Sequence, residues 1–290
     1  AQAGGWGPMM DALRAQDPAL LEPMGAYGLT IAGVLSAAGS VAIGLAFLGS
    51  PQLLTRFMAA RDQEQIVNGG FWAVLCVIGF DVGAVFGGMA GRTLFPGLAD
   101  PETILPEMSA AFFPDFFTGI FLVVVLAAIM STVDSLLILA SSSVVRDVVQ
   151  KALGYDASER TLSNLGKGVT VVIGGVGLVV ALLEVRMIFD FVLFAWSGIA
   201  CAFTPVVLLS LFWKRTTKAG AVAGMIFGFA TTVVWVRAFK ADFYDLYEMI
   251  PGFLAGLAAC FVVSLLTEPH PDAVEELESV RASVGPTFSR

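Results

Sequence analysis

The chain has 290 residues, of which 57% are hydrophobic and only 14% charged, and its mean hydropathy is +0.83. Soluble domains carry roughly 25% charged residues, so this composition excludes an ordinary soluble domain and predicts an all-α polytopic membrane protein. The net charge of −8 resides in loops and the tail, and no basic patch with interleaved aromatics accompanies it, which argues against nucleic-acid binding.

Residues 1–26 are polar and contain Asp11, Arg14, Asp17 and Pro18. Helical turns are possible in this segment but a membrane span is not, so we expect an extramembrane loop. It has no initiator Met, basic n-region or cleavage-site pattern, so it does not read as a signal peptide and resembles the interior of a longer chain.

The first apolar segment covers about residues 27–58 and contains five glycines, which permit close helix approach. Ser50 and Pro51 interrupt it, because proline lacks a backbone donor and clashes with the preceding turn. Two interpretations have equal weight: a packing kink, or a discontinuous helix whose freed backbone groups line a cavity.

A second apolar segment, about residues 68–90, has Asp81 at its midpoint. A carboxylate at this depth should face the protein interior, either as a structural acid bonded to Ser or Thr of a neighbouring helix or as part of an ion or solute site. Residues 91–116 are rich in Pro, Asp and Glu and are expected to form a loop.

The third segment, Phe117 to Asp147, carries hydroxyls and a carboxylate at its centre. At about 100° per residue, Ala128, Ser131, Thr132 and Ser135 share one stripe of the helix, and Asp134 lies to its other side. The hydroxyls can bond back to preceding carbonyls or face a packed or hydrated interior. A carboxylate beside them favours a functional interior, and hard oxygen ligands suit a small hard cation.

Four further spans are expected at about residues 165–183, 189–213, 219–236 and 247–266, which makes seven, and residues 267–290 should be an acidic tail that is disordered or forms a brief surface helix. Basic residues are more numerous in the connections on one side of the membrane: Arg56, Arg61, Arg146, Lys151, Arg160, Lys167, Lys214, Arg215 and Lys218. The other side holds Arg14, Arg92, Arg186, Arg237 and Lys240. This asymmetry predicts an outside N-terminal segment and a cytoplasmic tail in the cell membrane.

Several separated motifs resemble the sodium:solute symporter family, in its bacterial sodium/proline and sodium/pantothenate branch. They are LGSPQLLTRFMAARD, LAAIMSTVDSLLILASSSVVRDV, FAWSGIACAFTPVVLLSLFWKRTTKAGAVAGMIFG and YEMIPGFLAG. The resemblance implies a leucine-transporter-like fold of two inverted five-helix repeats. The first five spans here would form the second repeat, and the last two would be peripheral helices. The first repeat is absent, so the chain resembles a C-terminal portion: 1–26 a loop, 27–266 the transmembrane domain and 267–290 the tail.

The resemblance also implies site residues. Sodium ligands correspond to the hydroxyls of Ser131 and Thr132 and the carbonyl of Ala128. Proline symporters place a Trp and a Tyr before the Gly-x-Pro step, where this chain has Ile43 and Phe47 ahead of Pro51. That departure puts proline itself in doubt. Asp81, Asp134 and Ser135 are further candidates for ion or solute contact.

The implied function is sodium-coupled import of a small amino-acid-like or carboxylate solute by alternating access. Its partners would be sodium, the solute, the lipid bilayer and the missing N-terminal half, without which the chain should not transport. The alternative is a non-transporting sensor module of the same family. A hydrolytic enzyme is disfavoured because the single histidine, His270, lies in the tail, and a retinal protein because the last span has no lysine.

Overall fold

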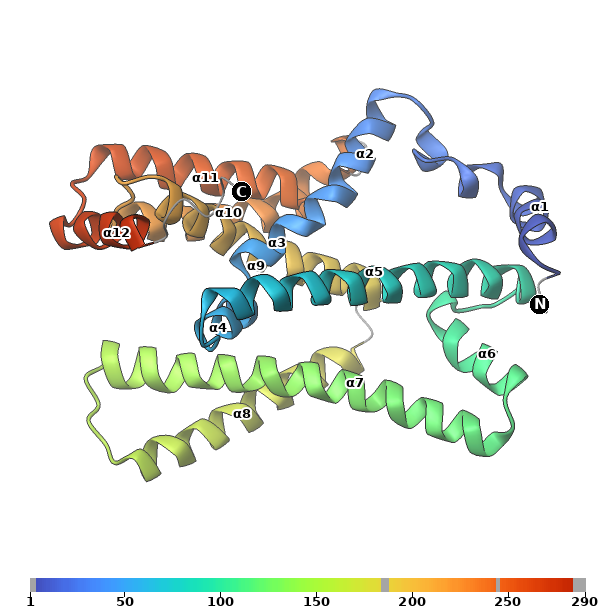
Figure 1. Ribbon diagram of the computed structural model, residues 1–290, viewed down its shortest axis with the longest axis horizontal. Coiled ribbons are helices and arrows are strands. Elements are labelled where there is room, and N and C mark those ends of the chain that lie inside the picture. Colours follow the sequence, from blue (N-terminus) through green and yellow to red (C-terminus); the bar gives the residue numbers. More distant parts are fainter. Residues whose placement is uncertain (1–3, 184–187, 244–245, 284–290) are drawn as a thin grey trace. The chain divides into compact units, whose positions relative to one another are not determined.

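The computed structural model describes residues 4–183, 188–243 and 246–283, and in this part of the chain every regular element is helical (Figure 1). Its α-helices are α1 Trp6–Gln16, α2 Ile31–Ala42, α3 Ala46–Gly49, α4 Pro51–Met58, α5 Gln63–Leu94, α6 Ile104–Phe112, α7 Asp115–Ser142, α8 Glu159–Leu182, α9 Ile188–Phe212, α10 Lys218–Val234, α11 Met249–Leu266 and α12 Pro271–Ser283. The 3₁₀ turns are η1 Pro18–Leu21, η2 Gly25–Tyr27, η3 Ile43–Leu45, η4 Pro101–Thr103 and η7 Lys240–Phe243, and π-helical stretches, η5 Ser143–Ala152 and η6 Trp235–Phe239, extend α7 and α10.

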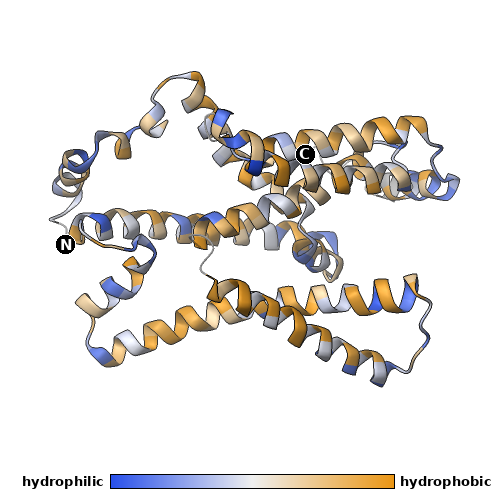
Figure 2. Ribbon diagram, turned by 180° about the vertical axis from the view of Figure 1, so that it is seen from behind, coloured by the Kyte–Doolittle hydropathy of each residue, from blue (hydrophilic) through white to orange (hydrophobic). Residues whose placement is uncertain are grey.

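Seven stretches of the described residues are long and apolar enough to cross a membrane: Ile31–Gly49, Gln63–Leu94, Asp115–Ala152, Glu159–Leu182, Ile188–Phe212, Lys218–Phe243 and Met249–Leu266. The predicted all-α class and the seven spans are confirmed. Figure 2 shows hydrophobic residues along most of these helices, with hydrophilic residues gathered near helix ends and in connections. The chain is therefore a multi-pass membrane protein.

Some predicted boundaries were wrong because local caps extend the helices. α5 begins at Gln63, before the expected residue 68, since the Asp62 carboxylate accepts from Gln65 N at 2.8 Å. α8 begins at Glu159, six residues early, and Ser158 Oγ accepts from Thr161 N at 3.3 Å. The expected loop at 91–116 was also partly wrong, because η4 and α6 lie within it and α6 ends just before Pro114.

The chain divides into two compact units. One contains most of α1 together with α5 to α8, and the other contains α2 to α4 together with α9 to α12. In the first unit α7 and α8 form an antiparallel hairpin (Figure 1), which Arg146 and Glu159 join by a forked ion pair with one N···O distance of 3.0 Å. Trp6 of α1 packs edge-to-face on Phe86 of α5 at 5.5 Å between ring centroids.

In the second unit a seam of small residues joins α10 to α11. The buried small positions recur every four residues on both helices: Gly220, Gly224, Gly228 and Thr232 on one, Gly252, Gly256, Cys260 and Ser264 on the other. A Cβ on Gly224 would lie 2.8 Å from Cys260 Cβ, so the two helices could not approach this closely with larger residues. Figure 1 shows the pair running side by side.

α9 packs on this seam through a buried backbone carbonyl that a proline leaves without its helical donor. Pro205, buried inside α9, has no N–H to donate to the carbonyl of Cys201 four residues earlier. That carbonyl oxygen lies against Gly256, whose Cβ would be 2.8 Å away, and against Gly228. Glycine Cα–H groups can approach a carbonyl where a side chain could not. The proline and the two glycines together therefore allow α9 to pack closely on α10 and α11.

Candidate functional site

The residues predicted from sequence fall into two groups, one in each unit. The first group lies midway along α7. Ser131 Oγ donates to the carbonyl of Ala128 at 2.8 Å, and Thr132 Oγ1 donates to the same carbonyl at 3.3 Å. Ser135 Oγ donates to the carbonyl of Ser131 at 2.9 Å. These residues are all exposed in this structure.

This bonding pattern has a chemical consequence. A hydroxyl that coordinates a cation does so through its lone pairs and must send its proton elsewhere. Ser131 and Thr132 send theirs to Ala128, so both oxygens keep lone pairs directed away from the helix backbone. The back-bonding expected of hydroxyls in a membrane helix is present, and it is compatible with cation coordination by the same oxygens.

Asp134 lies on α7 beside this stripe and Asp81 lies on α5, and both are exposed. Among the described residues of their own unit, neither carboxylate has a hydrogen-bond or ion-pair partner. The structural bond to a Ser or Thr of a neighbouring helix, considered as one role for Asp81, is therefore not made within this unit.

The second group surrounds the interruption predicted at Ser50 and Pro51. α3 ends at Gly49, Ser50 is extended with ψ of 116°, and α4 begins at Pro51. The Ser50 carbonyl accepts from Leu53 N at 3.0 Å and Leu54 N at 3.1 Å, which starts the new helix. The segment is thus a discontinuous helix. The 3₁₀ turn η3 interrupts its α-helical hydrogen bonding a second time, just before α3.

Ser50 itself is fully buried, and in the described part of the chain its Oγ is the buried side-chain oxygen that lacks a hydrogen-bond partner. A buried unpartnered hydroxyl costs about 1–3 kcal/mol. The break between α3 and α4 therefore contains a buried hydroxyl that could still form a hydrogen bond.

Ile43 and Phe47 lie directly before this break, and both contact Trp196 of α9. The Trp196 indole Nε1–H donates to the Ile43 carbonyl at 3.4 Å, and the Trp196 ring packs edge-to-face on Phe47 with centroids 5.1 Å apart. Thr204, two turns further along α9, donates to the Leu45 carbonyl at 3.0 Å. Sequence reasoning missed both α9 residues, since neither a lone Trp nor a lone Thr in an apolar span indicates its partner.

A buried charge pair was also missed. Glu248, 3% exposed, pairs with Lys240 at 2.9 Å and receives a long hydrogen bond of 3.5 Å from Ser197. The neighbouring Tyr247 donates its phenol to the Leu193 carbonyl at 3.0 Å. Burial raises the pKa of the Tyr247 phenol, and the adjacent Glu248 carboxylate raises that pKa further, so Tyr247 remains a neutral donor.

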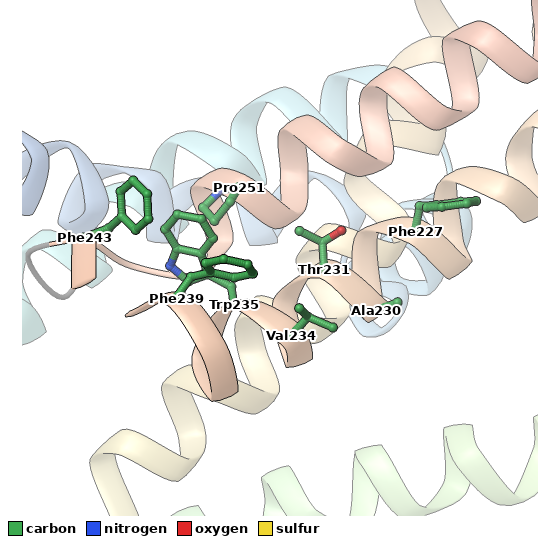
Figure 3. Close-up of a pocket in the computed structure, with 8 residues that line it drawn as sticks. All are labelled: Phe227, Ala230, Thr231, Val234, Trp235, Phe239, Phe243 and Pro251. Atoms are coloured by element: carbon green, nitrogen blue, oxygen red, sulfur yellow. The ribbon is translucent and has the colours of Figure 1, made fainter. Parts of the chain in front are cut away.

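A cavity of about 530 Å³ lies on α10 and the start of α11 (Figure 3). It is lined by Phe227, Ala230, Thr231, Val234, Trp235, Phe239, Phe243 and Pro251. Its lining is almost wholly apolar, and the Trp235 N–H is already bonded to the Leu246 carbonyl at 3.0 Å. A zwitterion or carboxylate would find too few polar partners here, so this cavity does not suit the predicted solute.

A discontinuous helix and a hydroxyl stripe at mid-span define this chain as a multi-pass helical membrane protein with the kind of interrupted span from which secondary transporters build their solute and ion sites. Comparison with known proteins identifies the family. Residues 2–228 match the model of the sodium:solute symporter family, and the chain belongs to that family.

Individual relatives agree with this assignment. The chain is 39% identical over 281 residues to the high-affinity proline transporter PutP of Bacillus subtilis, covering 94% of this chain and 57% of the relative. It is 36% identical to a sodium/proline symporter of Haemophilus influenzae (85% of this chain, 50% of the relative) and 32% identical to that of Escherichia coli (94% and 54%). The chain thus spans about half the length of these relatives. No solved structure matches it.

Proposed function

We propose that this chain forms the second half of the core, with two peripheral helices, of a sodium-coupled symporter that imports a small amino-acid-like solute. Membership of the family supports the transporter class, and relatives named as sodium/proline symporters make proline the first solute to test. In this proposal the first five spans form the second of two inverted repeats, and an N-terminal half of the same transporter supplies the other repeat.

The observation that carries the sodium site is the shared carbonyl of Ala128. Because Ser131 and Thr132 both donate to it, their hydroxyl oxygens are oriented with lone pairs free for a cation. The Ala128 carbonyl oxygen, which accepts both hydroxyl protons here, would become a third hard ligand once one of those hydroxyls rotates to another acceptor. Small hard cations take about six oxygens, so the remaining ligands would come from the other half, the solute or water.

The solute wall in this proposal is the break between α3 and α4. Ile43, Phe47 and Pro51 would line it. Ser50 is fully buried in this structure, so its unpartnered hydroxyl would reach a polar group of the solute only in a conformation that opens the break. Asp81 and Asp134 would serve a second cation or a cationic group of the solute. The 1–26 segment would lie outside, 27–266 would span the membrane, and the 267–290 tail, which contains α12, would be cytoplasmic. The orientation rests on the basic residues of the connections, of which Arg186 lies outside the described residues.

The test is uptake by a full-length transporter containing this chain, reconstituted in proteoliposomes with and without an inward sodium gradient. Labelled proline, pantothenate and short monocarboxylates would be compared. Accumulation of one of them only with sodium supports the symporter, whereas binding without accumulation favours the sensor alternative.

Thr132→Ala tests the sodium site. A ligand to a charged group contributes about 1.5–3 kcal/mol, so the half-saturating sodium concentration should rise at least about tenfold, with Thr132→Ser close to wild type. Thr170→Ala is the matched control, because Thr170 on α8 also donates to a carbonyl of its own helix, Gly166, at 2.9 Å. An unchanged sodium dependence in Thr132→Ala would count against the assignment.

A further inference from the structure

α9 holds the interrupted helix by two hydrogen bonds that cross between elements more than 150 residues apart in sequence. Thr204 Oγ1 donates to the Leu45 carbonyl, and Trp196 Nε1 donates to the Ile43 carbonyl. Both accepting carbonyls belong to η3, the 3₁₀ turn that precedes α3. Hydrogen bonds of 3₁₀ turns have poorer geometry than those of α-helices, so their carbonyls are good acceptors for outside donors.

The packing at the other end of α3 is equally close. Gly49, the last residue of α3, lies on the backbone and hydroxyl of Thr204, where any Cβ would collide. Thr204 is fully buried, and Ser50, which follows Gly49, is fully buried as well. Thr204 of α9 therefore contacts both ends of α3: the turn before it through a hydrogen bond, and its last residue, Gly49, through direct packing.

Trp196 acts on the same short helix from its side. Its ring packs on Phe47, and it lies against the core cluster of Ala42, Ala46, Ala200, Cys201 and Met249. Phe47 and Ile43 are the solute-wall candidates of α3 and η3. The indole, which packs on the core cluster, thus contacts both candidates: the carbonyl of Ile43 and the ring of Phe47.

We infer that Trp196 and Thr204 are positioning residues for the solute wall, holding η3, α3 and the break at Ser50 in one geometry through the carbonyls of Ile43 and Leu45. This inference rests on the proposed function in that it calls the surface a solute wall. The effect of Thr204 on the geometry of residues 43–54 can be measured without that assumption. Neither residue needs to touch the solute. Each acts through the backbone that presents Phe47 and Ser50.

The variants remove or keep the Thr204 donor in the full-length transporter. Thr204→Val keeps the shape and loses the donor, whereas Thr204→Ser keeps the donor. Thr232→Val is the control for the loss of a fully buried hydroxyl, because Thr232 donates to Gly228 of its own helix at 3.0 Å and interacts with Cys201 of α9, not with η3 or α3. Two readouts are compared: kinetics of sodium-driven proline uptake, and hydrogen–deuterium exchange of peptides covering residues 43–54.

Losing one hydrogen bond changes an equilibrium constant by about two- to tenfold. Thr204→Val should therefore raise the half-saturating proline concentration by that factor, while the maximal rate stays within about twofold. Exchange at residues 43–54 should accelerate by a similar factor, with α10 and α11 unchanged. Thr204→Ser should restore both values, and Thr232→Val should move neither.

Unchanged exchange and unchanged half-saturation in Thr204→Val would overturn the inference. So would a fall in maximal rate alone with faster exchange throughout α9 to α11, since that pattern indicates general destabilisation. If the wild type transports none of the labelled solutes, the proposed function fails, and exchange alone decides the positioning role. Acceleration confined to residues 43–54 then supports it, and its absence overturns it.

Discussion

The seam between α9, α10 and α11 makes a quantitative prediction at Gly256. A Cβ added there would lie 2.8 Å from the Cys201 carbonyl oxygen, 3.1 Å from the Gly224 carbonyl oxygen and 3.2 Å from Gly228 Cα. Ordinary contact begins at 3.4 Å. All three neighbours are backbone atoms, so no flexible side chain can move aside, and α9 and α10 must each shift by several tenths of an ångström.

The expected cost follows from this geometry. Overpacking in a close-packed interior costs about 1–3 kcal/mol, and replacing a helical glycine by alanine returns up to about 1 kcal/mol of helix propensity. Gly256→Ala should therefore destabilise the chain by about 1–2 kcal/mol. Gly256→Leu should exceed about 3 kcal/mol, because it adds further atoms beyond a Cβ that is already too close to three backbone atoms.

The assay is equilibrium unfolding of the chain in mixed detergent micelles with increasing dodecyl sulfate, followed by tryptophan fluorescence. Gly177→Ala on α8 is the matched control, since its Cβ would meet nothing within 4 Å, and it should be neutral or stabilising. If Gly256→Ala proves as stable as Gly177→Ala, the reasoning that these three helices pack through glycine is refuted.

Two further stability predictions use the same assay. Lys240→Met should destabilise the chain by about 2–3 kcal/mol, because it leaves the buried Glu248 carboxylate without its ion-pair partner. Adding Glu248→Gln should recover most of the loss. If Lys240→Met alone is as stable as wild type, the ion pair contributes nothing to stability. Asp62→Ala should cost about 1 kcal/mol by removing the N-cap of α5, whereas Asp62→Asn should retain most of the stability; equal losses in both would contradict a capping role.

Features that depend on neighbours in sequence were predicted well. The seven spans follow from runs of about 20 apolar residues. The interruption at Ser50 follows from the proline beside it, and the shared stripe of Ser131 and Thr132 follows from the helical repeat. The errors at 91–116 and at the start of α8 arose where short polar caps, rather than hydropathy, decided where a helix begins.

The small-residue seam was readable in principle but was missed. Glycines at 220, 224 and 228 have the four-residue spacing that brings membrane helices together, and so do the small residues from 252 to 264. The spacing alone does not tell which helix packs against which.

The sequence by itself determined what each helix is: its length, its interruption at Pro51 and the hydroxyl stripe of α7, because these depend on residues within one or two turns. Only the tertiary structure decided which groups meet. The carbonyl of Cys201 lies in the glycine seam, Thr204 reaches Leu45, and Lys240 neutralises Glu248. Each of these contacts joins residues from different elements, so each depends on how apolar faces pack once the helices exist.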